Sequence, residues 1–157
     1  MLHRDVTFAA VLTAMSAVSA VSAETHNVRE VFRDFEAVCF SYAQNGFGVE
    51  LNLLIEQAGF TFVEKASDGS DVFNADAVQL IIGEKTCAFG MAQLPFDAML
   101  GWTKDWAATQ GLMHTIESKS RHGGQYWIWA GNDFDIALEE DSFANGVPLT
   151  ALILVRK

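Results

Sequence analysis

The two cysteines constrain the fold of this chain most, because each lies on the apolar side of a segment with a different periodicity. Between residues 28 and 42 the apolar side chains recur every three or four positions, which predicts an amphipathic helix with Cys39 on its buried face. Between residues 85 and 92 larger and smaller side chains alternate, which predicts a strand with Cys87 on the face of larger residues. Both thiols are therefore expected to point into the core.

The N-terminal segment indicates the compartment in which these cysteines reside. Residues 1–23 carry a histidine and an arginine at positions 3 and 4, continue as an apolar run over residues 6–20, and end in Val21, Ser22 and Ala23. This is the pattern of a secretory signal peptide with its cleavage site, and the alternative is an uncleaved anchor. The run is short for a membrane span, which needs about 20 residues. We expect an exported protein, periplasmic or secreted, with residues 1–23 as signal peptide and 24–157 as one mature domain.

Export favours a disulfide between Cys39 and Cys87, because exported proteins fold in an oxidising environment. Closing a loop of about 49 residues removes roughly 4 kcal/mol of conformational freedom from the unfolded chain. The alternatives are two separate buried thiols, or a nucleophile, redox or metal role. The spacing matches neither a Cys-x-x-Cys redox motif nor a set of zinc ligands. The sequence thus predicts a structural disulfide, with no metal site and no cofactor.

The remaining periodicities predict an α+β domain. We expect a largely antiparallel sheet of about five to seven strands, with two N-terminal helices and one mid-chain helix packed on it and one disulfide. The mid-chain helix is expected to bury a stripe that includes Trp106, with Trp102 at its margin. The expected helices span residues 28–42, 47–58 and 96–110, and the expected strands span residues 60–64, 77–82, 85–92, 112–117, 125–130, 133–139 and 149–155.

Two faces in this scheme raise questions of packing. On the second helix Phe47 falls on the buried face with the leucines, whereas Val49 and Leu53 lie off it and either pack on a second neighbour or are exposed. On the strand 85–92 the face opposite Cys87 carries only small side chains, among them Ala88. Such a face admits something bulky; the usual occupant is a helix, and a ligand is the alternative.

Two local patterns are candidates for ligand binding. Trp127 and Trp129 share one face of the strand 125–130, where exposed indoles would offer a platform for a sugar ring or a peptide. The alternative, which we favour, is a central strand buried on both faces. Lys119, Arg121 and His122 form a basic loop before two glycines, which would suit an anion, although a solvated hairpin loop is the simpler interpretation.

No recognisable catalytic constellation accompanies these candidates. His114 and Glu117 form a lone His-x-x-Glu, and simple alternation would place them on opposite faces of their strand. The net charge of −10 disfavours nucleic acid and anionic surfaces as partners. We therefore expect noncovalent binding of a protein or small-molecule partner, with no stable membrane span after signal cleavage. The alternatives are a small hydrolase using His114 and His122, and a structural accessory subunit of an envelope assembly.

Overall fold

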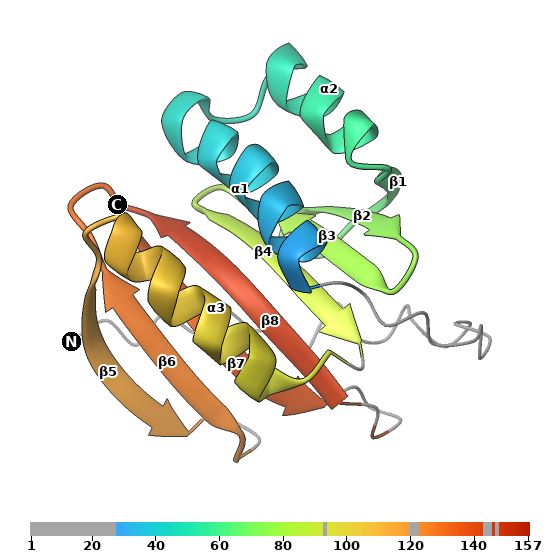
Figure 1. The fold of residues 1–157 in the computed structure, drawn as a ribbon. Helices are drawn as coiled ribbons and strands as arrows, with labels where there is room; N and C mark the ends of the chain where they lie inside the picture. The colour runs from blue at the N-terminus through green and yellow to red at the C-terminus, as the bar shows by residue number, and fades with distance from the viewer. Residues whose placement is uncertain (1–27, 93, 120–122, 143–145, 147) are drawn as a thin grey trace.

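The chain folds into one antiparallel sheet with helices on it (Figure 1). The computed structural model describes residues 28–92, 94–119, 123–142, 146 and 148–157. The helices in these ranges are α1 (Val28–Asn45), α2 (Val49–Gln57) and α3 (Phe96–Thr109). The strands are β1 (Thr61–Lys65), β2 (Asp71–Ala75), β3 (Val78–Ile82), β4 (Thr86–Ala92), β5 (Met113–Lys119), β6 (Gln125–Ala130), β7 (Phe134–Ser142) and β8 (Pro148–Arg156).

The strands pair in the order β1-β2-β3-β4-β8-β7-β6-β5, and every neighbouring pair is antiparallel. The predicted α+β class, its three helices and its disulfide are confirmed. The described residues hold eight strands, one more than the expected range, because the sequence predicts no strand at β2, between the expected strands 60–64 and 77–82. Asp71 and Asn74 are unusual in strands, yet β2 pairs along its length with β3, which is buried throughout.

Helix α1 is fixed to the sheet by the predicted disulfide and by a hydrogen bond. Cys39 and Cys87 are both fully buried. Their sulfur atoms form a disulfide bond, and their Cα atoms are 5.5 Å apart. The hydroxyl group of Tyr42 donates a hydrogen bond of 2.6 Å to the carbonyl oxygen of Gly83, in the turn between β3 and β4. Burial raises the pKa of Tyr42, although Arg156 opposes this shift. Both links join α1 to the same end of β4.

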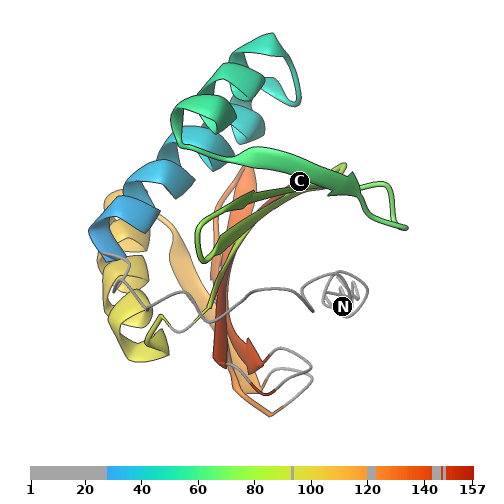
Figure 2. The same ribbon diagram turned by 90° about the vertical axis from the view of Figure 1, so that its right-hand side faces the viewer.

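All three helices of the described residues lie on one side of the curved sheet (Figure 2). The core between the two layers contains Cys87, Phe89 and Met91 of β4, together with the inward faces of the helices. The opposite face, with Ala88, packs against apolar side chains of neighbouring strands such as Ile153. The expectation that a helix covers the small residues is therefore wrong for the described part of the chain. The larger face attracts the helices because it offers more apolar surface to bury.

Helix α2 differs from the prediction at its start. Gly48 has an extended backbone, with φ −168° and ψ −175°, so the helical register begins at Val49. Phe47 is therefore outside the helix and is 50% exposed, which makes its predicted burial wrong. The rest of the predicted face is confirmed, because Leu51 and Ile55 pack in the core. The helix then ends before Gly59, whose φ of +82° favours glycine.

Candidate functional site

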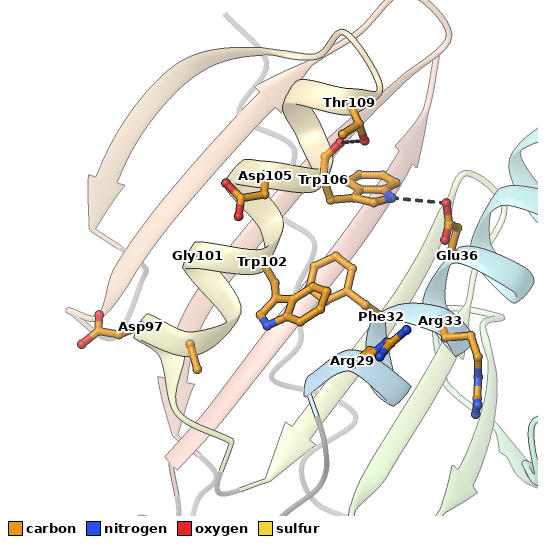
Figure 3. Close-up of a pocket in the computed structure, with 11 residues that line it drawn as sticks. Arg29, Phe32, Arg33, Glu36, Asp97, Gly101, Trp102, Asp105, Trp106 and Thr109 are labelled. Atoms are coloured by element: carbon orange, nitrogen blue, oxygen red, sulfur yellow. Dashed lines mark hydrogen bonds between the residues drawn. The ribbon is translucent and has the colours of Figure 1, made fainter.

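A groove lies between helices α1 and α3, as Figure 3 shows. Its volume is about 700 Å³. Each wall is one stripe of a helix, since positions three or four apart lie on the same face. We call this hollow the α1–α3 groove. The α1 wall consists of Arg29, Phe32, Arg33 and Glu36, and the α3 wall of Asp97, Ala98, Gly101, Trp102, Asp105, Trp106 and Thr109.

Aromatic rings form the centre of the groove. The ring of Trp102 stacks on that of Phe32, with centroids 6.1 Å apart and planes inclined by 27°. Phe32 is buried, whereas Trp102 is 45% exposed, so the outer ring faces solvent and the inner one anchors it. The ring centroids of Trp106 and Phe32 are 6.2 Å apart, and the indole Nε1 of Trp106 donates a hydrogen bond of 3.5 Å to Glu36. The rings of both helices thus form one apolar surface.

Small side chains on α3 leave the groove open. Ala98 and Gly101 lie beside Trp102 in the α3 wall. A Cβ atom added to Gly101 would meet no atom within 4 Å, so the space next to this residue is empty of protein. Two larger side chains at these positions would fill the hollow. The groove is therefore open because Ala98 and Gly101 have small side chains or none, and not because the two helices are unusually far apart.

The charged residues that line the groove are exposed, and their signs differ between the two walls. On the α1 wall, the acidic Glu36 accepts the hydrogen bond from Trp106. Arg29 and Arg33 belong to α1, and Arg33 forms an ion pair of 3.0 Å with Asp34 of the same helix. Asp97 and Asp105 belong to α3 and point away from α1 in Figure 3. A ligand would therefore meet the apolar rings at the centre and solvated charges of both signs at the edges. Such an arrangement suits a flat apolar group better than a bare ion.

The tryptophans singled out from the sequence lie on the other side of α3. Trp127 and Trp129 belong to β6 and share the helix-facing side of the sheet, with ring centroids 6.1 Å apart. Trp129 is buried, with 3% exposed, and it contributes to the core. Trp127 is half-buried, and the Nζ atom of Lys104 from α3 lies 4.2 Å from the centroid of its ring. The indole surface is therefore largely occupied by the protein's own side chains.

The edge strand β5 adds two more residues to this region through a bulge. The register shifts between His114 and Ile116, so that His114 lies opposite Trp129 and Glu117 opposite Trp127. Paired residues of antiparallel strands share a face, and the prediction that His114 and Glu117 lie on opposite faces is therefore wrong. The ring of His114 stacks on Trp127 with centroids 4.9 Å apart. We call Lys104, His114, Glu117, Trp127 and Trp129 the β5–β6 cluster.

The basic loop is only partly described. Lys119 is exposed at the end of β5 and lies opposite Gln125, which places it on the same face as the tryptophans. Arg121 and His122 lie outside the described residues. Ligand binding by Trp127, Trp129, Lys119, Arg121 and His122 therefore stays a prediction. In the ranges that the structure describes, no group of histidine, cysteine, aspartate or glutamate side chains is arranged to hold a metal ion.

The sequence did not identify the α1–α3 groove. It placed Trp102 at the margin of a buried stripe, and the structure shows this residue exposed on the wall of the groove. Three features of α3 could have indicated an open wall: a glycine inside the helix, an alanine three residues before it, and a tryptophan beside it. Glycine inside a helix costs about 1 kcal/mol relative to alanine, so its presence suggests a need for space.

The comparisons with known proteins add no family. No protein-family model matches the chain, and no curated protein or solved structure matches it significantly. Within the described ranges, none of the helices has the length and apolar character needed to cross a membrane. A functional proposal for this protein therefore rests on the geometry of its own residues.

Proposed function

We propose that this protein acts by noncovalent binding, and that the α1–α3 groove takes a flat apolar group of a small ligand or partner. One observation carries the proposal: Trp102 is 45% exposed and stacks on a buried ring beside an open hollow. A large exposed aromatic side chain next to a cavity is typical of binding sites. A stacked inner ring holds the indole in place, so a ligand would pay little to order it.

The residue types in the groove favour binding over catalysis. Its lining in the described residues contains arginine, aspartate, glutamate and tryptophan, and it contains no histidine, cysteine or serine. Covering about 100 Å² of apolar surface would stabilise a complex by roughly 2.5 kcal/mol before the cost of association. Charges of both signs at the rim would then select ligands by the polar groups beside their apolar part.

The planar fluorescent anion 1-anilinonaphthalene-8-sulfonate provides a direct test. We expect the purified protein to bind it, and we expect Trp102→Ala to weaken binding by about tenfold. Gly101→Leu should weaken binding similarly, because it fills the hollow while it favours the helix. Met113→Ala is the matched control, since Met113 is 73% exposed on β5, outside the groove. Equal binding by all four proteins would reject the groove as the site.

We further propose that the protein is exported and that residues 1–23 are removed. The apolar N-terminal segment and a fully buried disulfide support this proposal. Intact mass measurement of the protein recovered from its own compartment should give the mass of residues 24–157. Alkylation under denaturing conditions should label no thiol before reduction and two thiols after it. Two labelled thiols without reduction would contradict an oxidising location.

A small hydrolase is the second candidate, because the bulge in β5 brings His114 and Glu117 to one face beside Trp127. A histidine next to a carboxylate can act as a general base. The test is hydrolysis of p-nitrophenyl acetate, measured for the protein and for His114→Gln. A rate above that of free imidazole that is lost in His114→Gln would support this candidate. A rate unchanged by the substitution would exclude His114 as its base.

A further inference from the structure

Helix α2 presents apolar side chains to solvent on the side that faces away from the core. Leu51 and Ile55 of this helix are buried, with 1% and 2% of their surface exposed. Val49 and Leu53 each lie two positions from Leu51, which is about 200° around a helix. They are 79% and 53% exposed. We call these two side chains the α2 ridge, and Phe47, 50% exposed, precedes it.

Neither the fold nor helix propensity accounts for the α2 ridge. A surface helix normally carries polar residues opposite its buried stripe, and a helix that is apolar on both sides is typically covered on both. Valine is a weaker helix former than alanine, glutamate or lysine, so an exposed valine does not stabilise α2 by itself. In Figure 1, α2 lies at the outer margin of the helix layer, with no other labelled element on its outer side. The ridge is therefore available to a partner.

The charges around the α2 ridge determine what such a partner carries. Between residues 45 and 61 the only charged residues are Glu50 and Glu56, and both are exposed. At 100° per residue, Glu56 lies beside the ridge on one side and Glu50 beside it on the other. A second copy of the chain would place glutamates against glutamates, and each copy carries a net charge of −10. An anionic lipid surface would be repelled for the same reason.

We propose that the α2 ridge docks an amphipathic helix of a partner protein, with an apolar stripe flanked by lysine or arginine side chains. The two ridge residues are spaced by four, which is the spacing of contacts between packed helices. Glu50 and Glu56 then pair with basic side chains on either side of the apolar contact, as flanking charges do in paired helices. The charge pattern sets the orientation and excludes acidic partners.

The size of α2 sets the strength of this contact. Its nine residues span roughly 14 Å, so two to three turns of a partner helix can lie along it. Such an interface is smaller than the standard stable interface of about 1,600 Å². The contact is therefore weak and reversible by itself, with a dissociation constant on the order of micromolar. A longer partner would gain affinity by contacts elsewhere on the protein.

The test uses a synthetic 18-residue helix of leucine and lysine, with the leucines on one stripe and a fluorescent label, and measures fluorescence anisotropy with the full protein. Two peptides are controls: one with glutamate in place of lysine, and one with the same leucines and lysines in scrambled order. We expect the protein to bind the first peptide at least tenfold more tightly than either control. Equally strong binding of the scrambled peptide would show that net charge alone, and not the apolar stripe, causes the binding. That result would overturn the proposal.

Protein variants locate the contact. Val49→Gln with Leu53→Gln should weaken peptide binding about tenfold, and circular dichroism should show an unchanged fold because both side chains are exposed. Glu50→Lys with Glu56→Lys should reverse the preference toward the acidic peptide. Asp133→Lys, a change of an exposed acid in another part of the chain, is the matched control and should alter binding less than about twofold.

Three results would overturn the proposal. The first is no binding of the basic peptide, and the second is equal binding by the protein with and without the two glutamine substitutions. The third is a dimer of the unsubstituted protein in analytical ultracentrifugation that the glutamine substitutions dissociate, because a second copy would then cover the ridge. Trp102→Ala should leave peptide binding unchanged, so failure of the ridge and failure of the α1–α3 groove remain separate outcomes.

Discussion

The two sides of α3 place tryptophans in opposite situations. On one side, in the α1–α3 groove, Trp102 is 45% exposed and rests on a buried phenylalanine. On the other side, in the β5–β6 cluster, Trp129 is 3% exposed and Trp127 is half-buried beside Lys104 and His114. In the densest aromatic segment of the sequence, Trp129 thus belongs to the core and Trp127 packs against it, whereas Trp102, expected at the margin of a buried stripe, is exposed.

The difference follows from what lies above each ring. β6 is an inner strand with neighbours on both sides, and α3 supplies Lys104 above Trp127. In the groove, the α3 wall beside Trp102 carries a glycine and an alanine, which are too small to cover an indole. The exposure of a tryptophan in this fold is therefore decided by its neighbours in space.

The largest expected effect is the difference in free energy of unfolding between a variant of the buried Trp129 and a variant of the exposed Trp102. Trp129→Ala should lower the free energy of unfolding by about 3 to 5 kcal/mol, because it empties a buried site. Trp102→Ala should lower it by about 1 kcal/mol or less, because the indole is half exposed and the buried ring beneath it remains. Guanidinium denaturation followed by far-ultraviolet circular dichroism measures both. Similar losses of stability in the two variants would show that the exposed Trp102 contributes to the fold as much as the buried Trp129 does.

Loss of the disulfide should loosen α1, which forms one wall of the α1–α3 groove, more than it loosens β6 in the β5–β6 cluster. Cys39→Ala with Cys87→Ala should cost roughly 4 kcal/mol of stability, from the freedom returned to the unfolded chain. Because α1 forms one wall of the groove, hydrogen exchange should accelerate in α1 more than in β6. Equal acceleration in the two elements would show that the disulfide stabilises only the whole fold, with no local effect on the groove wall.

Alkaline pH should lower the free energy of unfolding through Tyr42 and Tyr126. Burial raises the pKa of Tyr42 on α1, against the effect of Arg156, and burial followed by the nearby Glu139 raises that of Tyr126 on β6. A raised pKa means that the unfolded chain loses the proton first. Stability is therefore retained below about pH 10 and falls as the pH rises through the folded pKa.

Phenylalanine variants should reveal each contribution to this pH dependence. Tyr42→Phe and Tyr126→Phe should each reduce the loss of stability between pH 8 and pH 11, measured by guanidinium denaturation at both values. Tyr42→Phe should also lower stability at pH 8 by about 1 kcal/mol, since it removes the hydrogen bond to Gly83. An unchanged slope in either variant would show that the tyrosine keeps an ordinary pKa in the fold.

The smallest expected effect concerns the cation above Trp127. A double-mutant cycle of Lys104→Met and Trp127→Leu should give a coupling of about 0.5 to 1 kcal/mol, as for cation–π pairs that are partly exposed to solvent. The measurement is again the free energy of unfolding. A coupling of zero would mean that Lys104 does not hold the indole, and that a ligand could displace it at little cost.

The sequence allowed the prediction of most of the fold, because its strongest signals are periodic. Apolar spacing located α1 and α3, and the alternation in residues 85–92 placed Cys87 toward α1. The miss at β2 has a physical reason: a five-residue strand with aspartate and asparagine has weak intrinsic preference, and its pairing with the buried β3 stabilises it. Pairing partners far along the chain are not visible in local periodicity.

The sites were less predictable than the fold for two reasons. Alternation assumes a regular strand, and the bulge at Thr115 moved His114 and Glu117 to one face. The groove depends on the approach of α1 and α3, whose facing residues are about 70 positions apart, as Glu36 and Trp106 are. No window of the sequence contains both walls.

The position of β8 has a consequence for how the chain reaches this structure. β8 is the last strand of the sheet in chain order, yet it lies between β4 and β7 and joins the two halves of the sheet. Until β8 emerges from the ribosome, β1–β4 and β5–β7 have no common strand. The early chain can therefore form the separate hairpins but not the finished sheet, and the long-range pairings of β8 with β4 and β7 are expected to form last.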